Sequence, residues 1–137
     1  MIVIDTNVVF TGLISTKGAS YCLLTELANG NLDYALSTYL LFEYEDVLTR
    51  NFNKIPYNSD ELESILDSVA TLAHRVSPMF LWRPYLKDPK DDMILELAVA
   101  SNASAILTYN LRDFKGSEDF GIEAIEPLLY LKRKGTL

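Results

Sequence analysis

The chain opens with a short apolar run, MIVI at 1–4, that ends at Asp5. The run is continuous and rich in β-branched residues, which is typical of a strand buried on both faces. Such strands belong to parallel sheets, whose connections are usually helical crossovers. The first residues therefore favour a fold in which helices cover a parallel sheet.

The rest of the chain alternates between predicted strands and predicted helices. The further strands are predicted at 32–37 (LDYALS), 104–109 (SAILTY) and 122–127 (IEAIEP). Helices are predicted at 19–29, from a cap at Ser37 or Thr38 to about Arg50, at 59–76 with Ser59 as cap, from about Asp91, and from Pro127. The stretch 77–91 is predicted to be a connection with one short extended piece. We expect an α/β fold, a three-layer α/β/α domain with a central parallel sheet of four to five strands.

Length and composition fit one globular domain over residues 1–137, with 49% hydrophobic and 23% charged residues. No apolar run approaches the ~20 residues that span a bilayer, and the run before Asp5 is too short for a signal peptide. We therefore expect a cytoplasmic protein with no membrane segment. One cysteine and one histidine exclude an intramolecular disulfide and a histidine-rich zinc site.

The net charge of −7 argues at first against a nucleic-acid partner, because phosphate binding normally draws on a basic surface. A divalent-cation site removes this objection. Clustered carboxylates repel phosphate until they hold a metal ion, and the ion is then the largest local charge. The net charge therefore does not decide the partner.

The acidic residues fall at informative positions along the predicted elements. Asp5 ends the first strand, Glu43 lies in a helix, Asp92 opens another helix, and Asn110 and Asp113 follow the strand at 104–109. In open α/β sheets, ligands bind beyond the carboxyl ends of the strands. Asp5 and Asn110 would flank such a crevice if their strands are neighbours.

Carboxylates brought to one point repel one another, and a hard cation with oxygen ligands resolves that repulsion. Mg²⁺ or Mn²⁺ fits an all-oxygen set. Such an ion can polarise a phosphodiester and activate a water molecule, so no histidine base is needed.

Each of these residues also has a purely structural interpretation. Asp5 would cap the helix that follows it, and Glu43 would belong to a solvated acidic helix face. One aspartate of KDPKDD at 87–92 would cap a helix, while Asn110 and Asp113 would stabilise a polar turn. Only their conjunction favours a functional site.

Four segments in this order resemble the PIN-domain nucleases. They are IVIDTNV at 2–8, LLFEYEDVL at 40–48, DPKDDMILELA at 88–98 and LTYNLRDF at 107–114. The resemblance covers nearly the whole chain. It implies a metal-dependent nuclease that cleaves RNA with Mg²⁺ or Mn²⁺, often as a homodimer, and many prokaryotic members are VapC-like toxins neutralised by a cognate antitoxin.

The resemblance also assigns roles to individual residues. The catalytic acids would be Asp5, Glu43, Asp92 and Asp113, with the metal held by Asp5, Asp92 and Asp113 and with Glu43 positioning a second ion or the attacking water. The polar supports would be Asn7, Thr108 and Asn110, where Asn110 replaces an aspartate of many members. Asp91 is the reserve for the third acid, because the spacing to Leu95 and Ala98 favours Asp92.

The RNA backbone would be held by basic side chains. The candidates are Arg50, Lys54, Arg112 and the run at 132–134, although that run would also complement a helix C-terminus. Two alternatives stay open: a catalytically silent PIN-like binding scaffold, and an RNA-processing nuclease outside any toxin–antitoxin system.

Two other classes share an apolar strand followed by aspartate, but their requirements are not met. Receiver domains need an acidic pair after the first strand and a lysine late in the chain. Haloacid-dehalogenase-type phosphatases need a second acid two residues after the first, where this chain has Asn7.

Overall fold

The computed structural model describes residues 1–79 and 85–137, and five parallel strands form the centre of this part of the chain. The strands are β1 (Ile2–Ile4), β2 (Ala35–Leu36), β3 (His74–Arg75), β4 (Ala105–Leu107) and β5 (Glu123–Ile125). One sheet has the order β1-β4-β5, and β2 pairs with β3. A parallel bridge between Ile2 and Tyr34 joins the two groups. The predicted α/β class with a parallel sheet is confirmed.

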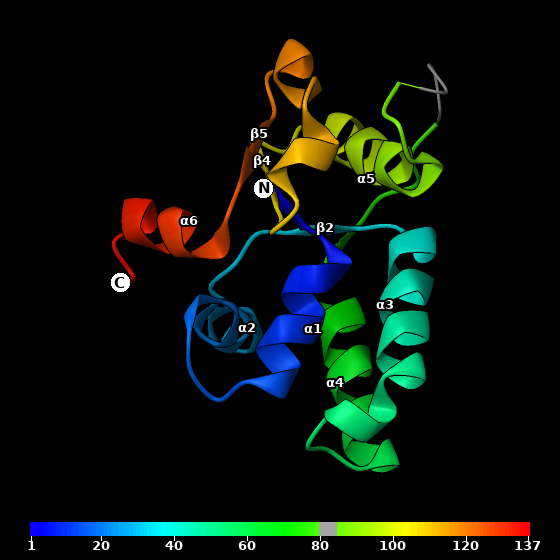
Figure 1. The fold of residues 1–137 in the computed structure, drawn as a ribbon, viewed down its shortest axis with the longest axis vertical. Coiled ribbons are helices and arrows are strands. Elements are labelled where there is room, and N and C mark those ends of the chain that lie inside the picture. The colour runs from blue at the N-terminus through cyan, green and yellow to red at the C-terminus, as the bar shows by residue number, and fades with distance from the viewer. Residues whose placement is uncertain (80–84) are drawn as a thin grey trace.

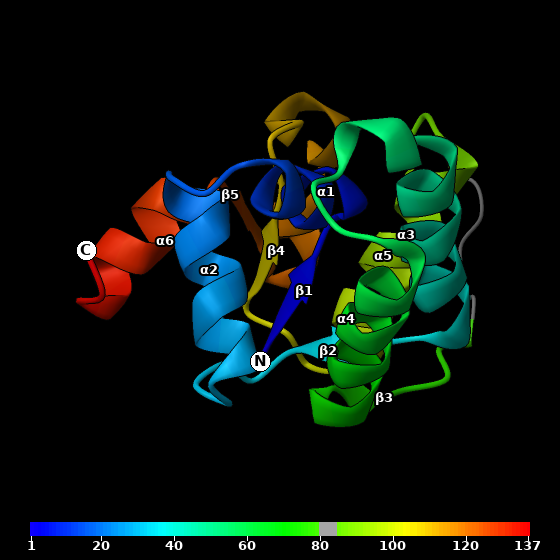
Figure 2. The ribbon, with the colours of Figure 1, turned by 90° about the horizontal axis from the view of Figure 1, so that it is seen from below.

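Helices lie on both sides of these strands, in three layers (Figure 1). They are α1 (Thr6–Ile14), α2 (Ala19–Ala28), α3 (Thr38–Arg50), α4 (Ser59–Leu72), α5 (Pro89–Ala100) and α6 (Pro127–Lys134). Short 3-10 helices are η1 (Phe52–Lys54), η2 (Leu111–Phe114) and η3 (Ser117–Phe120). Helix α5 contacts β1, β2 and β4 from one side, whereas α1, α2 and α4 lie on the other (Figure 1). Helix α6 lies beside α2 at the edge near β5 (Figure 2).

The sheet is buried because its strands are apolar on both faces. Residues Ile2–Ile4 of β1 and Ala105–Leu107 of β4 are all buried. β1 and β4 are paired in register from Ile2 opposite Ala105 to Ile4 opposite Leu107. The chain builds β2 and β3 on one side of β1, and then places β4 on its other side. The carboxyl ends of β1 and β4 therefore flank the point where the strand order reverses, which is the usual ligand site of such sheets.

Local signals explain where the helices begin. Ser37 caps α3 by accepting a hydrogen bond from the backbone N–H of Leu40 at 3.1 Å. Of the two predicted caps, Ser37 and Thr38, the first is therefore confirmed. The prediction of Ser59 as the cap of the next helix was wrong by one residue. Asn58 and Glu61 form a reciprocal capping box, and Ser59 is the first helical residue.

The segment after α4 also differs from the prediction. The helix ends at Leu72 rather than near residue 76, and His74–Arg75 forms β3 beside β2. The predicted connection at 77–91 is shortened, because α5 begins at Pro89 with Asp88 as its cap. Residues 80–84 of that connection, and with them most of its predicted extended piece, lie outside the described residues.

Helices α1 and α2 form a closely packed apolar pair. A Cβ atom at Gly12 would lie 2.5 Å from Leu24 Cδ1 and 2.8 Å from the Ser20 carbonyl oxygen, so only glycine fits there. In the described part of the chain no single helix is long and apolar enough to span a membrane. These two helices reach that length and composition only together, and they are bent by 97° to each other.

Candidate active site

A cleft of about 310 Å³ lies beyond the carboxyl ends of β1 and β4. The start of α1, one side of α3, the first turn of α5 and the segment around η2 all contribute side chains to it. The lining residues are Asp5, Thr6, Asn7, Phe10, Tyr39, Glu43, Val47, Asp88, Lys90, Asp91, Ile94, Asn110 and Asp113. The cleft is therefore strongly acidic, and three of the four predicted catalytic acids, Asp5, Glu43 and Asp113, line it.

Asp5 is held rigidly at the floor of the cleft. Its side chain is only 8% exposed. One carboxylate oxygen accepts the backbone N–H of Thr6 at 2.8 Å and so caps α1, and the other accepts the hydroxyl of Thr108 at 2.7 Å. Thr108 follows β4, so this hydrogen bond links the ends of two neighbouring strands. Asp5 thus caps α1 and also lines the acidic cleft, two roles that the sequence left as alternatives.

Glu43 reaches the cleft from α3, and a buried neighbour fixes that helix. The hydroxyl of Tyr44, which is 1% exposed, donates to the backbone carbonyl of Ile4 in β1. The Glu43 side chain is 18% exposed, and its Oε1 lies 3.9 Å from Nζ of Lys90 in α5. Glu43 is thus a largely enclosed carboxylate rather than part of a solvated helix face.

Of the two adjacent aspartates of α5, only Asp91 lines the cleft. Residue spacing favoured Asp92 as the third acid, but Asp92 does not line the cleft. The side chain of Asp92 is 2% exposed and accepts the backbone N–H groups of Tyr85, at 3.2 and 3.3 Å, and Leu86, at 2.7 Å. Its oxygens anchor the segment before α5, so Asp92 serves the fold locally and Asp91, the reserve, stands at the site.

The polar residues after β1 and β4 complete this side of the cleft. Asn110 and Asp113 line it, with Asp113 exposed on η2. The backbone N–H of Asn110 donates to the Thr108 hydroxyl at 2.9 Å, and the side-chain oxygen of Asn7 accepts the backbone N–H of Tyr109 at 3.5 Å. The expected supports Asn7, Thr108 and Asn110 are therefore gathered around Asp5.

Burial and crowding raise the pKa values of two of the acids. Desolvation, together with the charges of Asp5, Asp88, Asp113 and Asp92, raises the pKa of Asp91 to about 7. Burial also raises the pKa of Asp5, with Asp113 and Glu43 adding to the shift and the hydrogen bonds from Thr108 and Thr6 opposing it. Such repulsion is what a bound cation relieves.

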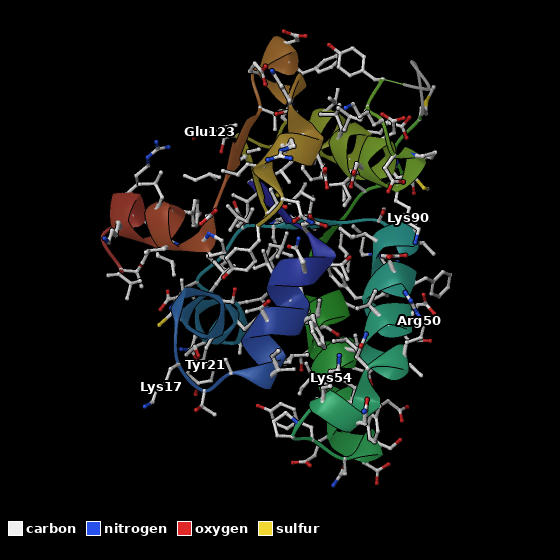
Figure 3. The ribbon with its side chains drawn as sticks, in the orientation of Figure 1. Lys17, Tyr21, Arg50, Lys54, Lys90 and Glu123 are labelled. Atoms are coloured by element: carbon white, nitrogen blue, oxygen red, sulfur yellow. The ribbon has the colours of Figure 1, made fainter. Side chains whose placement is uncertain are left out.

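The basic side chains that were predicted to bind RNA do not line this cleft. Arg50 is at the far end of α3, where it pairs with Asp46 at 3.0 Å, and Lys54 is in η1 beyond it (Figure 3). Arg112 lines a different hollow, beside η2 and η3. In the run 132–134, Arg133 pairs with Glu123 at 2.7 Å and Lys134 donates to the Asn31 carbonyl at 2.7 Å. Among the described residues, the basic side chain that lines the cleft is Lys90, which was not among the predicted RNA-binding residues.

The donor set of the cleft fits a hard divalent cation, although it is not a closed ligand cage. Across residues 1–79 and 85–137, no three His, Cys, Asp or Glu side chains lie close enough together to hold one ion by themselves. Mg²⁺ commonly binds through one or two carboxylates and completes its shell with water and substrate phosphate. Carboxylates with raised proton affinity around a partly open cleft suit that mode of binding.

Comparison with known proteins agrees with this geometry. The family model of the PIN domain matches residues 1–112. The chain belongs to the PIN domain family. PIN domains are generally nucleases, and their sites generally use divalent metal ions. The match ends at Arg112, so Asp113 is the one cleft acid beyond it.

No curated protein sequence matches the chain. Among solved structures, the PIN fold is similar to a chain in the crystal structure of VapBC2 from Rickettsia felis bound to a DNA fragment from their promoter. The TM-score is 0.58 at 19% sequence identity, and the match covers 90% of this chain and 98% of that chain. This similarity concerns the fold, and it extends over nearly the whole domain.

Proposed function

We propose that this PIN domain is a metal-dependent ribonuclease that hydrolyses RNA phosphodiester bonds in the acidic cleft. The observation that carries the proposal is the meeting of four carboxylates at the switch point of the sheet. They are Asp5, which follows β1 and caps α1, together with Glu43 of α3, Asp91 of α5 and Asp113 of η2. Asp91 takes the place that the sequence assigned to Asp92.

Asp5, Asp91 and Asp113 would hold Mg²⁺ or Mn²⁺ directly or through coordinated water, because carboxylate oxygens are the ligands these ions prefer and the three side chains do not form a closed cage. When bound, the ion would polarise the phosphodiester and lower the pKa of a coordinated water molecule. Comparing cleavage in Mg²⁺ with cleavage in Mn²⁺ decides between the two ions.

The protein's own side chains orient the metal-binding carboxylate and the attacking water, and accept the proton of that water. Thr108 and the Thr6 N–H fix the orientation of Asp5, so this carboxylate needs no rearrangement when the substrate arrives. Glu43 faces the same cleft from α3 and orients the attacking water, whose proton its carboxylate can accept. No histidine takes part, since His74 pairs with Asp33 at the β2–β3 edge.

We also propose that the chain is the toxin of a toxin–antitoxin pair. The support is the fold similarity to the VapBC2 complex, a toxin–antitoxin assembly. A cognate antitoxin protein would then bind this chain in the cytoplasm, and a homodimer is the assembly we expect.

The direct test is cleavage of end-labelled structured and unstructured RNAs by purified protein with Mg²⁺, with Mn²⁺ and with EDTA. Asp5→Asn is the inactive variant, and Asp67→Asn is the matched control, because Asp67 is exposed on α4 outside the cleft. We expect cleavage that requires metal, is retained by Asp67→Asn and is lost in Asp5→Asn.

Equal products from wild type and Asp5→Asn would reveal a contaminating nuclease and contradict the proposal. Absence of cleavage with either metal, while labelled RNA still binds, would favour a catalytically silent scaffold instead. Cleavage without any antitoxin gene beside the coding sequence would keep the nuclease and remove the toxin assignment in favour of RNA processing.

A further inference from the structure

Lys90 stands at the mouth of the acidic cleft. It lies in the first turn of α5, between Asp88 and Asp91, and Figure 3 shows it beside the start of α3. Its side chain is 61% exposed, and its Nζ lies 3.9 Å from the Glu43 carboxylate across the cleft. Among the described residues that line the cleft, Lys90 carries the only positive charge.

Helix stability does not explain a lysine at this position. The N-terminus of a helix carries a partial positive charge, so a cation in the first turn of α5 is electrostatically unfavourable. The ion pair with Glu43 adds little, because pairs with an exposed partner contribute about 0–1 kcal/mol. The feature that distinguishes Lys90 is its place beside the carboxylates.

We propose that Lys90 binds a phosphate of the RNA backbone and so sets the register of the strand in the cleft. This proposal rests on the proposed ribonuclease function. The ammonium would donate to a non-bridging oxygen of a phosphate next to the scissile one, as lysines commonly do at phosphate sites.

The geometry leaves Lys90 available for that contact. A separation of 3.9 Å from Glu43 is too long for a hydrogen bond, so this ion pair does not occupy the N–H donors of the ammonium. The flexible four-carbon side chain lets Nζ move from the carboxylate to a phosphate that enters the cleft. The same contact would offset the repulsion between the cleft acids and RNA.

The other basic side chains considered for RNA binding are less suited to the scissile region. Arg50 already pairs with Asp46 and does not line the cleft, and Lys54 lies farther along, in η1. They remain candidates only for RNA that extends beyond the cleft.

The test compares Lys90→Gln and Lys90→Arg with wild type, and uses Lys17→Gln as a matched control. Lys17 is an exposed lysine in the loop between α1 and α2, far from Lys90 in Figure 3. Steady-state cleavage of a single-stranded RNA in Mn²⁺ is measured over a range of salt concentrations, and fluorescence anisotropy gives the Kd of the same RNA.

We expect Lys90→Gln to raise KM and Kd about tenfold with little change in kcat, because one charged hydrogen bond to the RNA is lost. The slope of log kcat/KM against log salt should shrink by about 0.7, the value for one phosphate contact on a single strand. Lys90→Arg should restore both quantities, and Lys17→Gln should match wild type.

The proposal is overturned if Lys90→Gln keeps the wild-type Kd and salt slope, or if Lys17→Gln loses as much affinity. It is also overturned if kcat alone falls, since Lys90 would then act by positioning Glu43 and not by binding RNA. If wild type shows no metal-dependent cleavage, the ribonuclease function fails separately, and the anisotropy measurement still decides whether Lys90 binds RNA.

Discussion

Asp91 and Asp92 are adjacent in α5 and have opposite environments. Successive helical residues point about 100° apart, so one carboxylate faces the cleft while the other faces the chain before the helix. Asp91 lies among other acids, and Asp92 accepts backbone hydrogen bonds from Tyr85 and Leu86. The two side chains should therefore affect stability in opposite directions.

Metal-free protein should become less stable as the pH rises through the titration of Asp91. Its carboxyl has a pKa of about 7 when folded and 3.8 ordinarily, so the folded state keeps a proton that the unfolded state has lost between these values. The free energy of unfolding therefore falls with rising pH in this window. Asp91→Asn removes the effect and should be stabilised relative to wild type at about pH 8 but much less at about pH 4.

Urea unfolding in EDTA measures this difference, with Asp67→Asn as control. Saturating Mg²⁺ or Mn²⁺ at about pH 8 should stabilise wild type and leave Asp91→Asn nearly unchanged. A stability difference that does not vary with pH would mean that burial and the neighbouring acids do not raise the pKa of Asp91.

At the scale of elements, the position of α3 decides where Glu43 lies. Ser37 caps the helix, and the buried Tyr44 hydroxyl donates to the Ile4 carbonyl at the end of β1. Helix α3, which carries Glu43, is thus hydrogen-bonded to β1, the strand that precedes Asp5. Helix α4 is stabilised by its own capping box at Asn58, which lies outside the cleft.

Tyr44→Phe should therefore lower activity as well as stability. The Ile4 carbonyl loses a buried donor, which costs about 1–3 kcal/mol. A shift of α3 would displace Glu43, and cleavage should fall about tenfold in fully folded protein. Asn58→Ala should cost about 1 kcal/mol through loss of the cap and leave cleavage unchanged. Equal activity of the two variants, measured below their unfolding transitions, would contradict a positioning role for Tyr44.

The elements with strong local signals could be predicted from the sequence. The buried run before Asp5, the Ser37 cap and Pro127 at the start of α6 correspond to the structure. The strand at His74–Arg75 has two residues, both exposed, so its sequence has no apolar pattern from which a strand could be predicted. It forms because it pairs with β2. The cap at Asn58 was missed because Ser59 beside it is equally suited to capping.

At the scale of the whole molecule, the strand order assembles the site. Asp5 and Thr108 meet because β1 and β4 are neighbours, and α3 and α5 bring Glu43 and Asp91 from distant parts of the chain. The segments that carry the acids were identifiable from their motifs. Residue spacing alone did not decide between Asp91 and Asp92, and it did not identify Lys90 as the basic residue of the cleft. Both depend on which side of α5 faces the cleft in the folded chain.

The most direct test of this account is the kcat/KM of Asp91→Asn and Asp92→Asn for RNA cleavage in Mn²⁺, corrected for the folded fraction of each variant. We expect Asp91→Asn to lose about a hundredfold or more while remaining folded, because Asp91 is one of the proposed metal ligands. Asp92→Asn should lose about 1–3 kcal/mol of stability and keep most of its activity per folded molecule. The reverse pattern, with Asp92 essential for cleavage and Asp91 dispensable, would contradict the site described for this PIN domain.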